Sequence, residues 1–341
     1  MSLDDIALLT SVATTSDAVN VSSVRTGDVD EQAAMISDWA EQYQQISPGS
    51  FTGGLHQLNF GKTQVFSETV SQRVHEMGSA WPGSLVLAVV RKASEPLRWH
   101  GRLAGATDVA CFSGHQEFDI VVPAGSEILA VAIDSADFHD YAEAVSTDEA
   151  LRRSPGIPQL LSSPVQHSRL VRLLDATLQN AAEAPHLLQH AQSQKSLREA
   201  IFDQLIGLRE DTQQAAVSLN ANGRSALVSA VRDYALAQSN DVPSVADLCR
   251  VFGVSRRSLQ YAFEEMLGVS PVTYLRAQRL SAVRRTIIKT AETNTSVMEI
   301  AECWGFWHPS YFTASYKKLF GELPSATRQR HTRITPRTSQ D

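Results

Sequence analysis

One short polar stretch in the last third of the chain carries side chains suited to hydrogen bonding with DNA base edges. It contains Arg256, Arg257, Gln260 and Tyr261. An arginine can donate two hydrogen bonds to guanine, and a glutamine can pair with adenine, in the major groove. A single exposed arginine is more often an ordinary solvated residue. These side chains therefore become a candidate site only if one structural element presents them together.

Two segments that repeat each other predict such elements. SVADLCRVFGVS, from Ser244 to Ser255, aligns with SVMEIAECWGFW, from Ser296 to Trp307, at an offset of 52 residues. In each segment a serine is followed three residues later by an acid, which is the spacing of a helix capping box. Apolar residues at helical spacing then lead to a glycine, which is typical of a helix that ends in a tight turn.

A longer amphipathic helix is predicted after each glycine, now at an offset of 53 residues. Leu259 and Phe263 in the first copy correspond to Phe312 and Tyr316 in the second. A short helix, a turn and a longer helix make a helix-turn-helix unit, whose second helix enters the DNA major groove. The sequence predicts two such units, joined by a helix from Val272 to Lys289.

The buried side of each second helix determines which of its residues face outward. In the second helix of the first unit, strong hydrogen-bonding side chains face outward, so we expect this helix to supply most base discrimination. The second unit should rely more on phosphate contacts from Lys317 and Lys318. The predicted DNA-contacting residues are Arg256, Arg257, Gln260 and Tyr261 in the first unit, and His308, Pro309, Ser310, Thr313, Ala314, Lys317 and Lys318 in the second.

The distribution of charge supports this interpretation, although the whole chain carries a formal net charge of -7. Residues 224–341 hold 16 basic and 10 acidic residues, a net charge of +6, whereas residues 1–223 hold 14 basic and 27 acidic residues, a net charge of -13. A change of sign at one point predicts an acidic domain joined to a nucleic-acid-binding one. Four arginines of the connecting helix are assigned to phosphate or structural contacts: Arg276, Arg279, Arg284 and Arg285.

The N-terminal part reads as a β domain. Short apolar runs such as SLVLAVV (Ser84 to Val90) and ILAVAI (Ile128 to Ile133) are separated by Gly or Pro, which favours a sandwich or a small barrel. Leu129, Val131 and Ile133 alternate with smaller or polar residues, as in a half-buried strand. The first 32 residues or so are polar and weakly patterned, and we expect them to be mobile or loosely docked.

Helical patterning follows the strands. Helices are expected over Val165 to Asn180 and Pro185 to Leu208, where they could cover the β domain, form a dimer interface, or do both. The fold class is thus α+β and multidomain, with an N-terminal β domain, the following helices and an all-α C-terminal domain. The expected boundaries are 1–164 for the β domain, 165–217 for the helical region, 218–224 for a linker, 225–330 for the DNA-binding domain and 331–341 for a tail.

The run GFWHPSYFTASYKKLFGELPSATR, from Gly305 to Arg328, closely resembles the signature of the AraC/XylS transcription regulators. VSRRSLQYAFEEMLGVSP, RLSAVRR and WGFWH resemble the ethanolamine-utilisation branch of that family. The resemblance covers about the last third of the chain, with Tyr316 and Thr327 departing from the usual residues. It implies a cupin-like sensor with a dimerisation helix, two units on adjacent major grooves, and activation of catabolic genes. Its implied partners are double-stranded DNA, RNA polymerase, a small-molecule effector and a second protomer.

A metal-dependent cupin-type enzyme with an autoregulatory DNA-binding tail is the alternative function. Such an enzyme needs closely spaced histidines with a glutamate, but His115 and Glu117 have no second histidine nearby. His186 and His190 lack the intervening glutamate of a metalloprotease helix. We therefore expect no catalytic residue, no metal and no cofactor. Cys111, Cys249 and Cys303 are predicted to be buried, reduced thiols, and without a leader or an apolar span the protein is expected in the cytoplasm.

An effector pocket is the least determined feature. Aromatic residues of the β domain can line a cage, and carboxylates can meet a cationic group such as an amine, although aromatic residues in a small β domain are more often core. The resemblance to an ethanolamine regulator also suggests a small amine. The candidate ligand-binding residues are Glu68, Trp81, Trp99, Phe112, Glu117 and Phe118.

Overall fold

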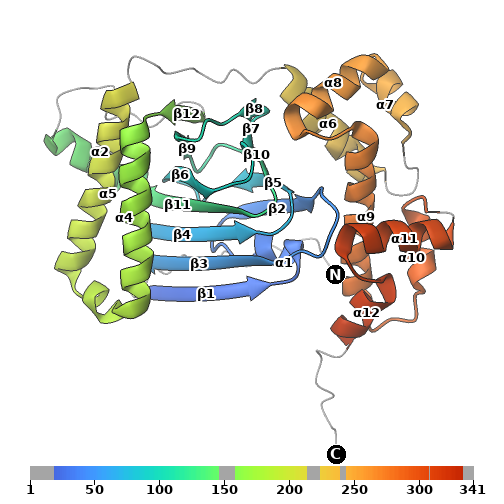
Figure 1. Cartoon of the computed structure of the whole chain (residues 1–341), viewed down its shortest axis with the longest axis horizontal. Coiled ribbons are helices and arrows are strands. Elements are labelled where there is room, and N and C mark those ends of the chain that lie inside the picture. Colours follow the sequence, from blue (N-terminus) through green and yellow to red (C-terminus); the bar gives the residue numbers. More distant parts are fainter. Residues whose placement is uncertain (1–18, 146–157, 213–222, 239–242, 307, 333–341) are drawn as a thin grey trace, which may run out of the picture.

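The computed structural model describes residues 19–145, 158–212, 223–238, 243–306 and 308–332. An N-terminal unit of two antiparallel sheets lies beside a C-terminal group of helices (Figure 1). Within these described ranges, no helix combines the length and the apolar character that a membrane crossing needs.

The larger sheet has seven strands, and all of its neighbouring strands pair antiparallel. Leu129, Val131 and Ile133 on its central strand are 0–1% exposed on one face, and Ala130 and Ala132 are equally buried on the other. The prediction of a half-buried strand was therefore wrong, because both faces of the sheet are covered. The spatial order is β1 (Asn20–Thr26), β3 (Gly53–Phe60), β4 (Thr63–Val70), β11 (Ser126–Asp134), β6 (Ser84–Lys92), β9 (Asp108–Ser113) and β12 (Gln159–Ser162).

The smaller sheet has five strands and encloses the main aromatic core with the larger one. Trp99, Phe112 and Phe118 are 3–5% exposed in this core, and Trp39 contacts Phe112 and Phe118 edge-on. The two sheets remain separate, so they form a sandwich and do not close into the expected alternative, a barrel. The order is β2 (Ala40–Gln45), β5 (Val74–Ser79), β10 (Phe118–Val122), β7 (Arg98–Trp99) and β8 (Arg102–Leu103).

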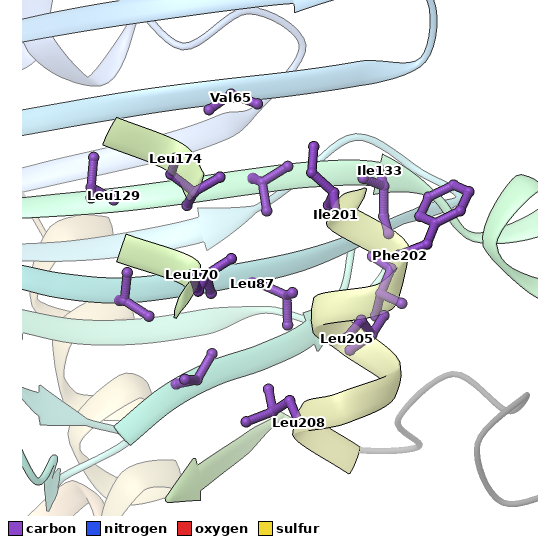
Figure 2. Close-up of a cluster of buried hydrophobic side chains, with 14 of the residues drawn as sticks. Val65, Leu87, Leu129, Ile133, Leu170, Leu174, Ile201, Phe202, Leu205 and Leu208 are labelled. Carbon is purple, nitrogen blue, oxygen red and sulfur yellow. The ribbon is translucent and has the colours of Figure 1, made fainter. Parts of the chain in front are cut away.

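Helices cover the outer face of the seven-stranded sheet, as Figure 2 shows for α4 (Pro164–Glu183) and α5 (Ala191–Thr212). Leu170 and Leu174 of α4 and Leu205 of α5 belong to the same buried cluster as Val65, Leu87 and Leu129 of the sheet, and α2 (Ser135–Val145) adds Phe138 to it. The expected helix over Pro185 to Leu208 was wrong in its first part. That part forms the separate short helix η1 (Pro185–Gln189), which ends at an extended His190.

The expectation that the first 32 residues are mobile or loosely docked was wrong for the part from Val19 onward, which forms a strand and a short helix. β1 pairs with β3 along its whole length, and α1 (Val29–Ala33) buries Val29 and Gln32. The polar pattern of β1 misled the sequence reading because an edge strand is stabilised by backbone hydrogen bonds that any residue can make. Residues 1–18 lie outside the described part.

The C-terminal helices follow the expected order. They are α6 (Gly223–Ala237), α7 (Val245–Val251), α8 (Arg256–Leu267), α9 (Pro271–Lys289), α10 (Val297–Cys303), α11 (Pro309–Phe320) and α12 (Pro324–Thr332). α6 begins within the segment expected to be the 218–224 linker, whose residues 218–222 lie outside the described ranges. α12 likewise extends two residues into the expected tail, and residues 333–341 are not described.

Candidate nucleic-acid interface

The first helix-turn-helix unit is built by local hydrogen bonds that the sequence dictates. Ser244 and Asp247 form a complete capping box at the start of α7. Gly253 has a φ of +63°, a left-handed conformation that glycine adopts without strain. Ser255 then caps α8, which ends at Gly268 in the same left-handed conformation. The turn and the caps fix where the second helix starts and stops.

The second unit repeats this construction with one difference. Ser296 and Glu299 form the capping box of α10, and Gly305 supplies the left-handed turn. The N-cap of α11 is His308, whose side chain makes no capping hydrogen bond, and Pro309 occupies the first turn. A proline there is preorganised for the helix because its missing N–H would have no intrahelical partner. The duplicated pattern therefore correctly predicted two units.

The predicted buried faces are confirmed. Leu259 and Phe263 of α8 are fully buried, as is Tyr316 of α11, and Phe312 is 2% exposed. Each pair lies in its own hydrophobic cluster, so each unit has a separate small core. α9 contributes to both cores and fixes the two units relative to each other.

The outward face of α8 carries the predicted base-contacting side chains. Arg256, Arg257 and Tyr261 are exposed, and Gln260 is half-buried. The Arg257 guanidinium lies 5.7 Å from the centre of the Tyr261 ring. Gln260 Nε2 donates to Glu264 Oε1 at 2.5 Å, so this intrahelical hydrogen bond must open if the amide is to pair with a base. The structure thus brings these four residues onto one accessible surface.

The outward face of α11 is less rich in strong hydrogen-bonding groups, as expected. His308, Pro309, Ser310, Ala314, Lys317 and Lys318 are exposed, and Thr313 is half-buried. Tyr311 is 51% exposed, with the Arg276 guanidinium 5.5 Å from its ring centre. The sequence analysis missed this tyrosine, whose only signal is its place between outward Ser310 and buried Phe312. A tyrosine beside an arginine at a helix tip can stack or hydrogen-bond at the DNA surface.

Two arginines of α9 are structural. Arg284 is 3% exposed, and its Nη2 lies 2.8 Å from Asp28 Oδ2. Arg285 Nη1 lies 2.8 Å from Asp30 Oδ1. Both carboxylates belong to the start of α1, so these ion pairs join the connecting helix to the β domain. Of the two roles expected for these arginines, phosphate or structural contact, Arg284 and Arg285 have the structural one.

The β domain also holds the C-terminal end of each second helix. Arg98 Nη1 donates to the Glu265 carbonyl of α8 at 2.7 Å. The Gly49 amide and Gln45 Nε2 donate to carbonyls at the end of α11, among them Leu319 at 2.6 Å from Gln45. Carbonyls at a helix end lack intrahelical partners, so these donors satisfy groups that would otherwise need water or a cap. The N-terminal ends, which carry the predicted DNA contacts other than Lys317 and Lys318, are left accessible.

A buried hydrogen-bonded row links the smaller sheet to α9. His75 is 0% exposed, with Nδ1 2.8 Å from the Tyr274 hydroxyl and Nε2 3.0 Å from Asp119 Oδ1. Burial acts to raise the pKa of Asp119, but the adjacent His75 lowers it overall. Gln44 Nε2 donates to Ser281 Oγ at 2.8 Å beside this row. The contact between sheet and connecting helix is therefore polar and specific.

Only some of the candidate ligand residues come together. Phe112 contacts both Trp99 and Phe118 in the core between the sheets, and partly buried Trp81 packs against this cluster. Glu117 is exposed on the surface and does not join them. Three of the aromatic candidates thus form a packed core.

Glu68 is the candidate whose environment is most unusual. It is 4% exposed and accepts hydrogen bonds from the Tyr43 hydroxyl at 2.9 Å and from Gln32 Nε2 at 2.8 Å. Burial raises the pKa of Glu68 to about 7. Glu41 and Glu76, which the sequence analysis missed, lie near it, and burial raises the pKa of each well above its usual range. For Glu41 the signal was strand alternation, which places it on the same face of β2 as Tyr43.

One cysteine differs from expectation. Cys111 is buried, which raises the pKa of its thiol to about 11, and Cys249 is half-buried, but Cys303 is exposed. The repeat itself explains the difference, because Cys249 aligns with buried Ala301 whereas Cys303 aligns with exposed Val251. The prediction that all three thiols are buried was wrong for Cys303.

Residues 248–330 match a protein family described as a helix-turn-helix domain. The probable thc operon regulatory protein of Rhodococcus erythropolis is 38% identical over 93 residues, which are 27% of this chain and 28% of that protein. The XylDLEGF operon transcriptional activator 2 of Pseudomonas putida is 35% identical over 88 residues, 26% of this chain and 56% of that protein. The matched segments thus span less than two thirds of either relative.

A solved structure, the AraC-like transcriptional activator CuxR, aligns with 84% of this chain and 99% of its own at 14% identity and a TM-score of 0.43. A likeness at that score does not establish a shared overall fold. The family match, by contrast, begins at Leu248 within α7 and covers the whole of α8, α9, α10 and α11. The C-terminal part of this chain is therefore a helix-turn-helix domain.

Proposed function

We propose that the protein is a sequence-specific DNA-binding transcription regulator of the AraC/XylS type, and an activator of catabolic genes. The observation that carries the proposal is the pair of accessible helix tips on α8 and α11, in a domain whose relatives include named operon activators. Both tips present side chains that can contact bases or phosphates, and both opposite ends are held by the β domain. Relatives of the matched segment are named as regulators, and we assign no enzymatic activity.

The length of α9 agrees with binding to adjacent grooves. Its 19 residues span roughly 28 Å at 1.5 Å per residue. Successive major grooves on one side of B-DNA lie about 34 Å apart. The length of α9 is close to this separation. One protomer is therefore of the right size for α8 and α11 to contact two successive major grooves.

The finer parts of the proposal concern partners. We infer a cupin-like sensor role for the β sandwich, a small-molecule effector, RNA polymerase as the target of activation, and kinship with the ethanolamine-utilisation branch. A homodimer is also proposed, although the buried leucines of α4 and α5 pack on the sheet (Figure 2) and give it no separate support. A dimer would use the other face of α4, which carries exposed Val165, and the neighbouring η1, which carries exposed Leu187.

The alternative, a metal-dependent enzyme, has no observation in its favour. In the parts of the chain that the structure describes, no three His, Cys, Asp or Glu side chains gather closely enough to hold a metal ion. His186 lies in η1 and His190 follows it, away from the core between the sheets.

Footprinting with the purified full chain tests the proposal. A pool of random duplexes yields the cognate site, and Arg257→Ala is then compared on cognate and random DNA. We expect a loss of about 1–3 kcal/mol on the cognate site and almost none on random DNA, since base contacts supply specificity. Arg172→Ala, an exposed arginine on α4, is the matched control and should change neither. Equal losses on both DNAs would place Arg257 among phosphate contacts, and failure to select any site would refute the regulator.

A further inference from the structure

The four arginines of α9 have two different kinds of surroundings. Arg284 and Arg285, in the second half of the helix, form ion pairs with carboxylates at the start of α1. Arg276 and Arg279, in the first half, are both half-buried. Among the residues that the structure describes, no carboxylate lies within ion-pair distance of either one. We call Arg276 and Arg279 the α9 arginine pair, and its positive charge is not neutralised within the protein.

Each guanidinium of the α9 arginine pair lies over an aromatic ring of the second helix-turn-helix unit. The Arg276 guanidinium is 5.5 Å from the centre of the Tyr311 ring, and the Arg279 guanidinium is 5.6 Å from the centre of the Phe306 ring. Arg279 Nε also donates to the Leu275 carbonyl at 3.3 Å. Contact with a ring face restricts a flexible side chain, so both groups are held in place before any ligand binds.

The two guanidinium groups repel each other. Burial lowers the pKa of Arg279, and the nearby positive charge of Arg276 lowers it further. Two like charges without a counter-ion raise the free energy of the free protein, and an anion bound beside both would offset this repulsion. A planar guanidinium matches the geometry of an oxyanion such as phosphate. The α9 arginine pair is therefore suited to bind an oxyanion.

The position of the pair indicates which oxyanion can reach it. α9 runs from the first unit to the second (Figure 1), and Arg276 and Arg279 lie about 8 and 12 Å from its first residue. Tyr311, the ring beside Arg276, is 51% exposed in the first turn of α11, next to the predicted DNA contact Ser310. The pair thus lies between the two units and beside the DNA-contacting end of α11.

A duplex bound by both second helices would present its backbone to this part of α9. The two half-sites are centred about 10 base pairs apart, so the phosphates midway between them lie about 5 base pairs from each centre. We propose that Arg276 and Arg279 bind a DNA phosphate between the two half-sites, and that Tyr311 positions Arg276 for this contact. This inference rests on the proposed function and adds a contact that neither α8 nor α11 supplies.

The contact should not read base sequence. Arginines that read the minor groove insert their side chains deeply into it. Both guanidinium groups of the α9 arginine pair are instead held against rings of the protein. Phosphate contacts position a protein on the duplex without carrying sequence information. We therefore expect the same gain in affinity from the pair whatever bases lie between the half-sites.

The salt dependence of binding tests for the phosphate contact. The full chain is titrated with the selected cognate site and with random DNA at several salt concentrations, followed by fluorescence anisotropy. Combining Arg276→Met with Arg279→Met removes both charges and keeps apolar side chains against the rings. The slope of log affinity against log salt should become shallower by about 1 on both DNAs.

Arg285→Met is the matched control for charge, because this arginine of the same helix is already paired with a carboxylate. It should keep the slope of the unaltered protein. Arg276→Lys should also keep the slope, because lysine still neutralises a phosphate, and this variant separates lost charge from lost packing. Thermal melts check that each variant is folded. An unchanged slope in the double variant, or a loss of affinity on cognate DNA alone, would overturn the proposal.

Neutral substitutions in the DNA backbone locate the phosphate. Single methylphosphonates replace the phosphates between the half-sites one at a time. At least one of them should weaken binding of the unaltered protein about tenfold, as expected for the loss of a charged hydrogen bond. The same substitution should weaken binding of the double variant less than about twofold, because the contact is already absent. Losses that multiply, or sensitive phosphates confined to the half-sites, would refute the assignment.

Variants of Tyr311 test its positioning role. Tyr311→Phe keeps the ring, so it should bind the cognate site within about twofold of the unaltered protein. Tyr311→Leu removes the ring and should reduce the loss caused by the sensitive methylphosphonate. An undiminished loss in Tyr311→Leu would exclude the positioning role.

Failure of the proposed function is distinguishable from failure of this inference. If no cognate site can be selected, the proposed function fails and the inference fails with it. If a cognate site is selected but its binding is insensitive to the double variant and to every methylphosphonate between the half-sites, only the inference fails.

Discussion

Arg284 of α9 gives the sharpest test of how the two parts of the molecule are held together. Its side chain is 3% exposed, its Nη2 lies 2.8 Å from Asp28 Oδ2 and 3.5 Å from Glu322 Oε1, and its guanidinium lies 5.3 Å from the centre of the Phe320 ring. Arg284→Met keeps much of the apolar packing but leaves Asp28 buried without its counter-ion. Breaking a buried pair in this way costs about 3–5 kcal/mol.

We expect the lower end of that range, about 3 kcal/mol, because Arg284 Nη1 has no hydrogen-bond partner among the described residues and the native pair is incompletely satisfied. Urea unfolding, monitored by far-UV circular dichroism at the helical signal, measures how much Arg284→Met lowers the free energy of unfolding. Asp28→Asn keeps a side chain that can cap α1, and combining it with Arg284→Met completes a double-mutant cycle that isolates the pair.

Arg285→Met is the matched control. Its ion pair with Asp30 is similar in length, but the arginine side chain is 43% exposed, so its loss should cost less than about 1 kcal/mol. If Arg284→Met is no more destabilising than this control, the buried pair does not join the two domains in the way described.

Three further outcomes are expected. Because burial raises the pKa of Glu68 to about 7 in the folded chain, the folded state binds more protons than the unfolded state; stability should therefore fall by about 3 kcal/mol as pH rises from about 4.5 to 7, and denaturant titrations of Glu68→Gln should show a smaller fall. Gly101→Ala should destabilise the chain, because Gly101 has a φ of +77° and an added Cβ would overlap Met266, and a thermal melt measures the loss. A fragment of residues 224–341 should bind DNA with an affinity that falls steeply with salt, which electrophoretic shifts at several ionic strengths would test.

The helical part of the candidate site was predictable because its signals are local. The capping boxes at Ser244 and Ser296, the glycine turns and the apolar spacing each act within one or two helical turns, and the duplication states them twice. The predicted inward residues Phe263 and Tyr316 are buried for the same reason. Local signals of this kind do not depend on how the rest of the chain is arranged.

The β domain was harder to predict because its decisive contacts join distant residues. Glu41 and Glu76 have the sequence signature of solvated strand residues, and only the stacking of a second sheet buries them. The pairing of Asp28 with Arg284 spans most of the chain and leaves no local pattern. Cys303 shows the converse, since it lies off the apolar helical spacing of Val297, Ile300 and Ala301, and this local pattern would have placed it at an exposed position.

The β domain binds the C-terminal ends of both α8 and α11, through Arg98 and Gln45. The distance between the N-terminal ends of these two helices is therefore fixed by the β sandwich. Inserting one base pair between the two half-sites of an operator moves the second groove by about 3.4 Å and turns it by roughly 35° around the duplex axis. A loosely tethered pair of units would follow that displacement at little cost. In this protein, either the hydrogen bonds from the β domain to one of the two helix ends must break, or the DNA must twist. The chain should therefore discriminate between operators by spacer length as well as by base sequence.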